Sequence, residues 1–142
     1  LFPASVEAIG GNLAEGLSSE IWWSPAHPFK SSLSGETASD LAGAFPQQWS
    51  QPLGFVYALF EIAGDVLARA QSTDKEKVKK ALAATKLDTI VGTIQFDDKH
   101  VGRTPLVGGQ WTKGAKYPWD LRVVYNDTAP AIPKTAALKA IG

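Results

Sequence analysis

The most regular pattern along the chain is an apolar repeat between Pro52 and Ala70. Its side chains recur at spacings of three and four, and this period predicts an amphipathic helix. The repeat consists of Leu53, Val56, Tyr57, Phe60, Ala63, Val66, Leu67 and Ala70. Glu61, Asp65 and Arg69 form the opposite, polar stripe. Asp65 and Arg69 are spaced for an ion pair across one helical turn.

Two glycines lie inside this predicted helix, at positions 54 and 64. Each costs about 1 kcal/mol relative to alanine in a helix interior. Because the helix must offset that cost, we expect another backbone to approach it closely at Gly54 and Gly64.

Three shorter segments also indicate helices. Residues 3–10 begin with a proline suited to the first turn, and residues 36–45 stop before Pro46. Residues 73–76, Thr-Asp-Lys-Glu, fit a capping box that opens a helix ending near Thr85. The side chains expected to point inward from that helix are Val78, Ala81 and Leu82.

Strands are predicted where apolar side chains alternate or cluster between turn residues. The predicted strands span residues 14–23, 89–96, 106–112 and 121–125. Prolines make residues 24–35 an extended connector, and residues 97–105 are rich in turn formers. The tail after residue 126 has two prolines, at positions 130 and 133, before a predicted short final helix.

Composition indicates one ordinary domain: 142 residues, of which 44% are hydrophobic and 20% charged. The longest unbroken apolar run, residues 53–60, is far shorter than the roughly 18 residues of a membrane-spanning helix. Fourteen basic and fourteen acidic side chains cancel, which argues against nucleic-acid binding. The absence of cysteine excludes disulfides and thiolate chemistry. A start at Leu1 without methionine suggests a mature product or a fragment.

Candidate catalytic chemistry is sparse. His27 lies between prolines and His100 follows two aspartates, and neither has the spacing of a metal ligand set. Asp97, Asp98 and His100 offer a cation site as one alternative, but a solvated turn is the favoured interpretation. No serine lies in a G-x-S-x-G motif, and the glycines near residue 10 lack the context of a dinucleotide loop. We therefore expect no enzyme, no cofactor and no metal.

Aromatic residues are the most distinctive feature of the composition. Trp22 and Trp23 are adjacent, so on a strand their side chains point to opposite faces. One can lie in the core, and the other requires a cleft, an interface or an absent part of the protein. Core packing is the favoured interpretation for Phe55, Tyr57 and Phe60. A stand-alone interaction or carbohydrate-binding domain remains an alternative, with exposed Trp22, Trp23, Trp49, Trp111 and Trp119 as its surface.

Four segments, taken in order along the chain, match one family pattern. They are VEAIGGNLAEGL at 6–17, WWSP at 22–25, GFVYAL at 54–59 and DTIVGTIQFD at 88–97. Together they resemble the C-terminal portion of type I periplasmic solute-binding proteins, in the leucine/isoleucine/valine-binding branch of ABC-importer receptors, which includes members that carry aromatic acids. The chain departs from this pattern at residues 45–49, where the family usually has a longer segment, and it lacks the N-terminal half.

The resemblance implies part of an α/β fold with two lobes and a ligand cleft between them. Residues 1–21 would belong to the second lobe, residues 22–25 to a hinge crossing, residues 26–104 to the first lobe and residues 105–142 to the second lobe again. The long helix would then meet polypeptide outside this chain. Otherwise its apolar stripe would lack cover, in particular Leu53, Val56, Phe60 and Leu67.

The resemblance also implies a function. The intact protein would be a non-enzymatic periplasmic receptor for a small carboxylate, either a branched-chain amino acid or an aromatic acid. Its partners would be that ligand, an ABC-importer permease and the absent N-terminal half, but no nucleic acid. The family layout suggests ligand contacts at Phe2, Pro3, Trp23, Gln51, Pro52 and Leu53.

Overall fold

The computed structural model describes residues 2–10 and 12–140, which form a mixed α/β architecture. This confirms the predicted fold class. In chain order the elements are α1 (Pro3–Ile9), β1 (Ser18–Ile21), α2 (Ala38–Ala44), α3 (Gln51–Ala70), α4 (Lys75–Ala83), β2 (Lys86–Thr89), β3 (Gly92–Gln95), β4 (Val107–Lys113) and β5 (Trp119–Tyr125).

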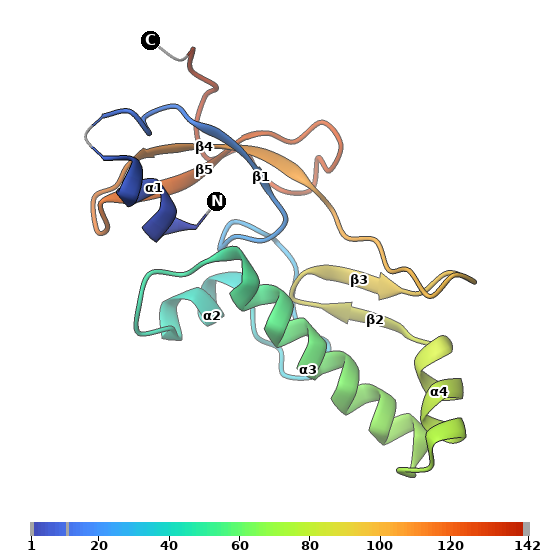
Figure 1. The fold of residues 1–142 in the computed structure, drawn as a ribbon. Helices are drawn as coiled ribbons and strands as arrows, with labels where there is room; N and C mark the ends of the chain where they lie inside the picture. The colour runs from blue at the N-terminus through green and yellow to red at the C-terminus, as the bar shows by residue number, and fades with distance from the viewer. Residues whose placement is uncertain (1, 11, 141–142) are drawn as a thin grey trace.

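The two ends of the chain build one antiparallel sheet, with strand order β1-β4-β5 (Figure 1). Ile21 on β1 lies opposite Val107 on β4, and Trp111 on β4 lies opposite Leu121 on β5. Helix α1 packs against β5. The core of this part consists of Val6, Ala14, Ile21, Val107, Trp111, Trp119, Leu121, Val123 and Ile132.

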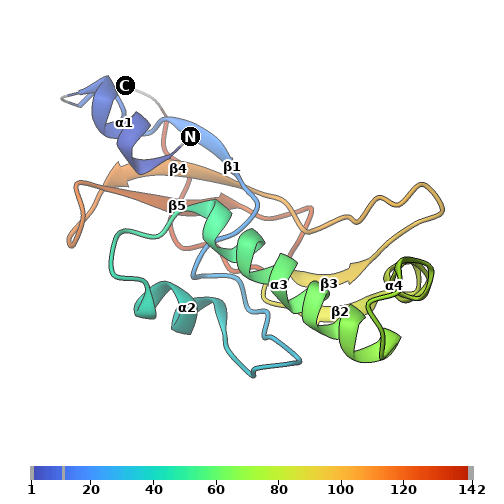
Figure 2. The same cartoon turned by 60° about the horizontal axis from the view of Figure 1, so that its bottom comes forward.

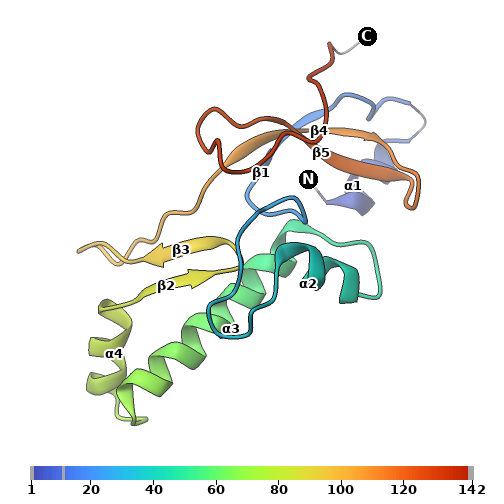
Figure 3. The ribbon, with the colours of Figure 1, turned by 180° about the vertical axis from the view of Figure 1, so that it is seen from behind.

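The middle of the chain builds a second part from α2, α3, α4 and the β2-β3 hairpin. Figure 2 shows α3 running alongside this hairpin, with α4 at the far end of α3. The view from behind in Figure 3 shows the chain passing between the two parts after β1 and again before β4. The second core consists of Trp23, Ala38, Ala58, Ile90, Val91 and Ile94.

The four helices predicted between residues 3 and 85 are confirmed in position, with one correction at α4. The N-cap of α4 is Asp74 and not Thr73, because the Asp74 carboxylate accepts the backbone N–H groups of Glu76 and Lys77, each over 3.1 Å. Helix α4 has no buried residue, and Leu82 is 41% exposed. The inward positions are therefore confirmed only in part, because Val78 and Ala81 are half-buried while Leu82 is exposed.

Helix α3 buries a face different from the predicted apolar stripe. Its buried residues are Gln51, Gly54, Ala58, Glu61 and Val66. Val56, Leu59, Phe60 and Leu67 are instead 50%, 64%, 75% and 49% exposed. The polar stripe is correct only in part, since Asp65 and Arg69 pair over 2.7 Å but Glu61 is buried and accepts the Ile90 N–H over 3.1 Å.

The two glycines of α3 have different surroundings. A Cβ at Gly54 would lie 2.3 Å from the ring of Trp23, whereas a Cβ at Gly64 would meet nothing within 4 Å. The close approach is thus made by an indole ring and occurs at Gly54 only. This ring explains the buried face, because α3 packs inward through small residues where Trp23 occupies the space.

The strand predictions require two corrections, and the helix predicted in the tail requires a third. The strand predicted over residues 14–23 is limited to Ser18–Ile21. The segment predicted as one strand at 89–96 belongs to a hairpin whose turn contains Ile90 and Val91, and Gly92 supports this turn with φ of 110°. Residues 126–140 contain no helix, because the tail instead bonds to the edge of β5 through Thr135 N–H and the Val123 carbonyl. In the part of the chain that the structure describes, no helix has both the length and the apolar character for crossing a bilayer.

Candidate functional site

Gln51, the first residue of α3, joins that helix to the sheet. Its Oε1 accepts the Trp22 N–H over 2.8 Å, and its Nε2 donates to the Glu20 carbonyl over 3.1 Å. The side chain is buried, with 3% of its surface exposed. Gln51 therefore satisfies backbone groups at the end of β1 while fixing where α3 begins.

A narrow cavity lies beside Gln51, between the sheet and the start of α3. Its lining residues come from α1, the segment before α3, the start of α3, β4 and β5: Pro3, Gln48, Trp49, Ser50, Gln51, Trp111 and Leu121. Its volume is about 10 Å³, the space of about one water molecule. Nε1 of Trp111 is buried without a hydrogen-bond partner among the described residues. A bound acceptor would remove the cost of leaving that donor unpaired.

The structure brings two of the six predicted ligand residues, Pro3 and Gln51, to this cavity. Phe2 precedes α1 and is 50% exposed. Pro52 and Leu53 lie in the first turn of α3 and are half-buried, and Leu53 packs against the second core.

Trp23, the remaining candidate, is fully buried in the second core. Its ring contacts Trp49 edge-on, with ring centroids 6.0 Å apart. In this conformation Trp23 is a core residue, so contact with a ligand would require a rearrangement that exposes it.

The tryptophans do not form the exposed surface expected for a carbohydrate-binding domain. Trp23, Trp111 and Trp119 are 0%, 2% and 4% exposed. Trp22 and Trp49 are half-buried, and the Trp22 ring lies 4.9 Å from the ring of Phe55. The expectation of five exposed tryptophans is wrong because the adjacent strands and α3 cover them. The core interpretation also fails for Phe60, which is 75% exposed.

His27 has a structural position in the connector. The Ser24 N–H donates to its Nδ1 over 3.1 Å, and the residue is 3% exposed. Burial lowers the pKa of His27 from 6.5 to about 4, so the imidazole is neutral at physiological pH. Among the described residues the His27 ring bonds to Ser24 and to no carboxylate. It therefore does not form a Ser-His-Asp catalytic triad.

Asp97 organises the turn that contains His100. Its Oδ1 accepts the N–H groups of Lys99 and Val101, and its Oδ2 accepts Arg103 Nη1 over 3.0 Å. The Val101 N–H and the other donors hold the pKa of Asp97 below its usual value. Residues 2–10 and 12–140 contain no group of three or more acidic, His or Cys side chains suited to a metal. These contacts favour the solvated-turn interpretation.

Sequence reasoning missed several residues of the cavity wall. Gln48 donates from Nε2 to the Trp119 carbonyl over 2.5 Å, and Trp111 and Leu121 face each other across the β4-β5 ladder. Only the pairing of β4 with β5 could have indicated Trp111 and Leu121, and no local motif marks Gln48.

Comparisons with known proteins identify the fold. No protein-family model and no curated protein sequence matches the chain. Among solved structures, it is similar to a leucine-binding protein from Thermotoga maritima, with a TM-score of 0.64 and 21% sequence identity over 85% of this chain and 34% of that chain. The chain thus spans about a third of the length of this solved relative. It has part of the type I periplasmic binding protein fold.

Proposed function

We propose that this chain is part of an extracytoplasmic solute-binding receptor that captures a small carboxylate and delivers it to an ABC importer. The observation that carries the proposal is the fold shared with a leucine-binding protein over 85% of this chain. A periplasmic location and a permease partner follow from the same proposal. The ligand class, a branched-chain amino acid or an aromatic acid, rests on the sequence resemblance.

In this proposal the two parts of the structure belong to two lobes. Residues 1–21 and 105–142 form the second lobe, residues 26–104 form the first lobe, and residues 22–25 form a hinge crossing. The buried cores of the two parts have no residue in common, which supports this division, and Trp49 packs against both. So does the position of Gln51, whose amide bonds to backbone on both sides of the Ile21–Trp22 junction.

Ligand capture would use a hinge motion. Closure of two lobes removes water from the cleft and strengthens polar contacts in it. Phe2 and Pro3 would contact the ligand from one lobe, and Gln51, Pro52 and Leu53 from the other. The cavity between Pro3 and Gln51 supports this arrangement, since it lies where the two sides meet.

We propose further that the outer face of α3 packs against the part of the protein outside these 142 residues. That face exposes Val56, Leu59, Phe60 and Leu67. Large apolar side chains grouped on one helix face are typical of an interface rather than of free surface. The solved relative supports this proposal, because 34% of its chain corresponds to this one.

Calorimetry on the whole protein tests the receptor function. A screen of branched-chain amino acids and aromatic acids should identify a ligand, and Phe2→Ala and Leu53→Ala should each weaken its binding by about tenfold, the effect of losing one good apolar contact. Leu138→Ala is the control, because Leu138 is 65% exposed in the tail. Unchanged affinity in both cleft variants would reject the site, and no binding of any carboxylate would reject the function.

A further inference from the structure

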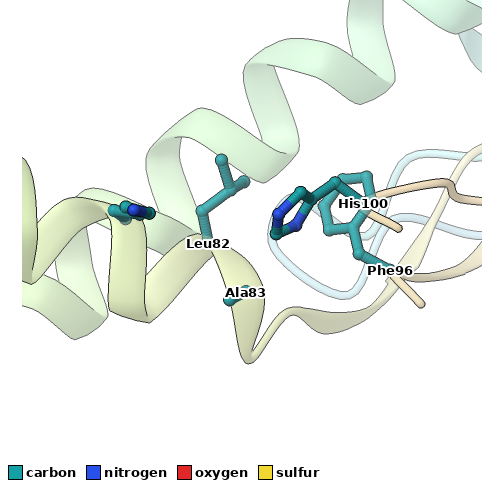
Figure 4. Close-up of a pocket in the computed structure, with 5 residues that line it drawn as sticks. Leu82, Ala83, Phe96 and His100 are labelled. Atoms are coloured by element: carbon teal, nitrogen blue, oxygen red, sulfur yellow. The ribbon is translucent and has the colours of Figure 1, made fainter. Parts of the chain in front are cut away.

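A second cavity lies at the opposite end of α3 from Gln51. It has a volume of about 270 Å³ and is lined by Lys79, Leu82, Ala83, Phe96 and His100. Figure 4 shows Leu82 and Ala83 on the α4 side and Phe96 and His100 on the other side. The 20 residues of α3 span about 30 Å. This cavity is therefore separate from the proposed cleft.

The wall of this cavity is hydrocarbon, with nitrogen atoms as its polar groups. Leu82, Ala83 and Phe96 supply the apolar surface. Leu82 is 41% exposed, and α4 has no buried residue. Lys79 and His100 bring an ammonium group and an imidazole to the same cavity. An apolar body would gain from contact with this surface because it would leave water.

Neither Lys79 nor His100 has an acidic partner in the part of the chain that the structure describes. Within the described ranges, neither Lys79 nor His100 makes an ion pair or a side-chain hydrogen bond. Helix α4 itself adds positive charge, since its sequence KEKVKKALA has four lysines and one glutamate. The carboxylate of Asp97, which begins the turn containing His100, bonds to Arg103 and to backbone N–H groups rather than to His100. The residues that line the cavity therefore include two basic side chains and no acidic one.

His100 is held at this cavity by a defined backbone. It has φ of 63°, in the left-handed region that few residues other than glycine and asparagine adopt. Asp97 stabilises the turn on both sides of it by accepting the N–H groups of Lys99 and Val101. The turn therefore fixes the direction in which the His100 side chain leaves the backbone.

We propose that this cavity is a second ligand site, for a small monocarboxylate with a compact apolar body such as an aromatic ring. The body lies against Leu82, Ala83 and Phe96, and the carboxylate accepts from Lys79 Nζ and the His100 ring. A volume of about 270 Å³ suits a single ring with a short acid chain. This site goes beyond the proposed receptor function and does not depend on it.

Chemical-shift mapping by NMR on the whole protein tests this site with two probes of the same shape. Phenylacetate carries the charge, and phenylacetamide is its neutral counterpart. We expect saturable shifts of the backbone amides at residues 79–83 and 96–102 with phenylacetate, and much weaker binding of the amide. Equal binding of both probes would overturn the charge argument. Shifts confined to residues 2–3 and 51–53 would overturn this site while supporting the receptor proposal.

Variants separate the two contributions. Lys79→Gln should weaken phenylacetate binding by about threefold, the effect of losing one partly exposed charge contact. Lys77→Gln is the matched control, because Lys77 is on the same helix but lines a different groove. Ala83→Phe should abolish binding by filling the cavity, and Ala83 is exposed, so the helix should tolerate the change. Binding that survives Ala83→Phe, or that Lys77→Gln weakens as much as Lys79→Gln does, would overturn the proposal.

Discussion

The buried imidazole of His27 couples folding to pH. Burial lowers its pKa from 6.5 to about 4. The unfolded chain therefore binds a proton in this range that the folded chain excludes. The stabilisation is complete above pH 6.5 and is lost as the pH falls toward 4. A shift of this size corresponds to about 3 kcal/mol.

Chemical denaturation from pH 7.5 to 4 measures this loss. His27→Asn is the comparison, since an amide oxygen can accept the Ser24 N–H in place of Nδ1 but does not titrate in this range. We expect the free energy of unfolding to fall more steeply with acid in the wild type than in His27→Asn. Equal slopes would show that His27 does not control the pH response.

Helix α3 offers a matched pair of glycine substitutions. Gly54→Ala should destabilise the fold by about 1–3 kcal/mol, because the new Cβ would lie 2.3 Å from the rigid Trp23 ring. Gly64→Ala should instead stabilise it by up to about 1 kcal/mol, since nothing lies within 4 Å of that Cβ. Urea denaturation of both variants checks the pair. Effects of the same sign would contradict the packing of Trp23 on α3.

Periodicity predicted the bounds of α3 closely but not the face that it buries. The apolar repeat is wide, and the side of the helix that meets this chain is set by the distant Trp23 ring at Gly54. The same local pattern predicts that Glu61 faces solvent. Its carboxylate instead accepts the N–H of Ile90, 29 residues away in the sequence. A local pattern carries no information about such partners.

The hairpin was missed because its two strands are short. β2 and β3 have four residues each, and the alternation after Thr89 continues through the turn at Ile90 and Val91. Apolar and polar side chains therefore alternate on both sides of the point where the chain reverses direction. Gly92, with φ of 110°, is the residue that allows the reversal. The alternating pattern alone predicts it to be an ordinary strand position.

The candidate site depends on contacts between segments that are distant in the sequence. Gln110 donates to the Gly16 carbonyl across 94 residues, and Gln48 reaches Trp119 across 71 residues. Such contacts bring Pro3, Trp111 and Gln51 to one cavity. The resemblance placed Pro3 and Gln51 near a ligand because it supplied a topology. Trp111 could not be placed without the strand pairing.

The outer face of α3 gives the clearest prediction for the molecule as a whole. Because it exposes Leu59 and Phe60 at 64% and 75%, the isolated 142-residue chain should self-associate as its concentration rises. Leu59→Ser and Phe60→Ser should each reduce that association, because each removes apolar area from the contact. Size-exclusion chromatography with light scattering measures the change.

Leu138→Ser is a close control for Leu59→Ser, because these leucines are 65% and 64% exposed and only Leu59 lies on α3. If general hydrophobicity drives association, both substitutions should act alike. If the face of α3 is an interface, only Leu59→Ser should act, and adding the remainder of the protein should replace self-association with a single compact species. A cooperatively folded monomer of the isolated chain at all concentrations would contradict the interface, since the exposed face would then need no cover.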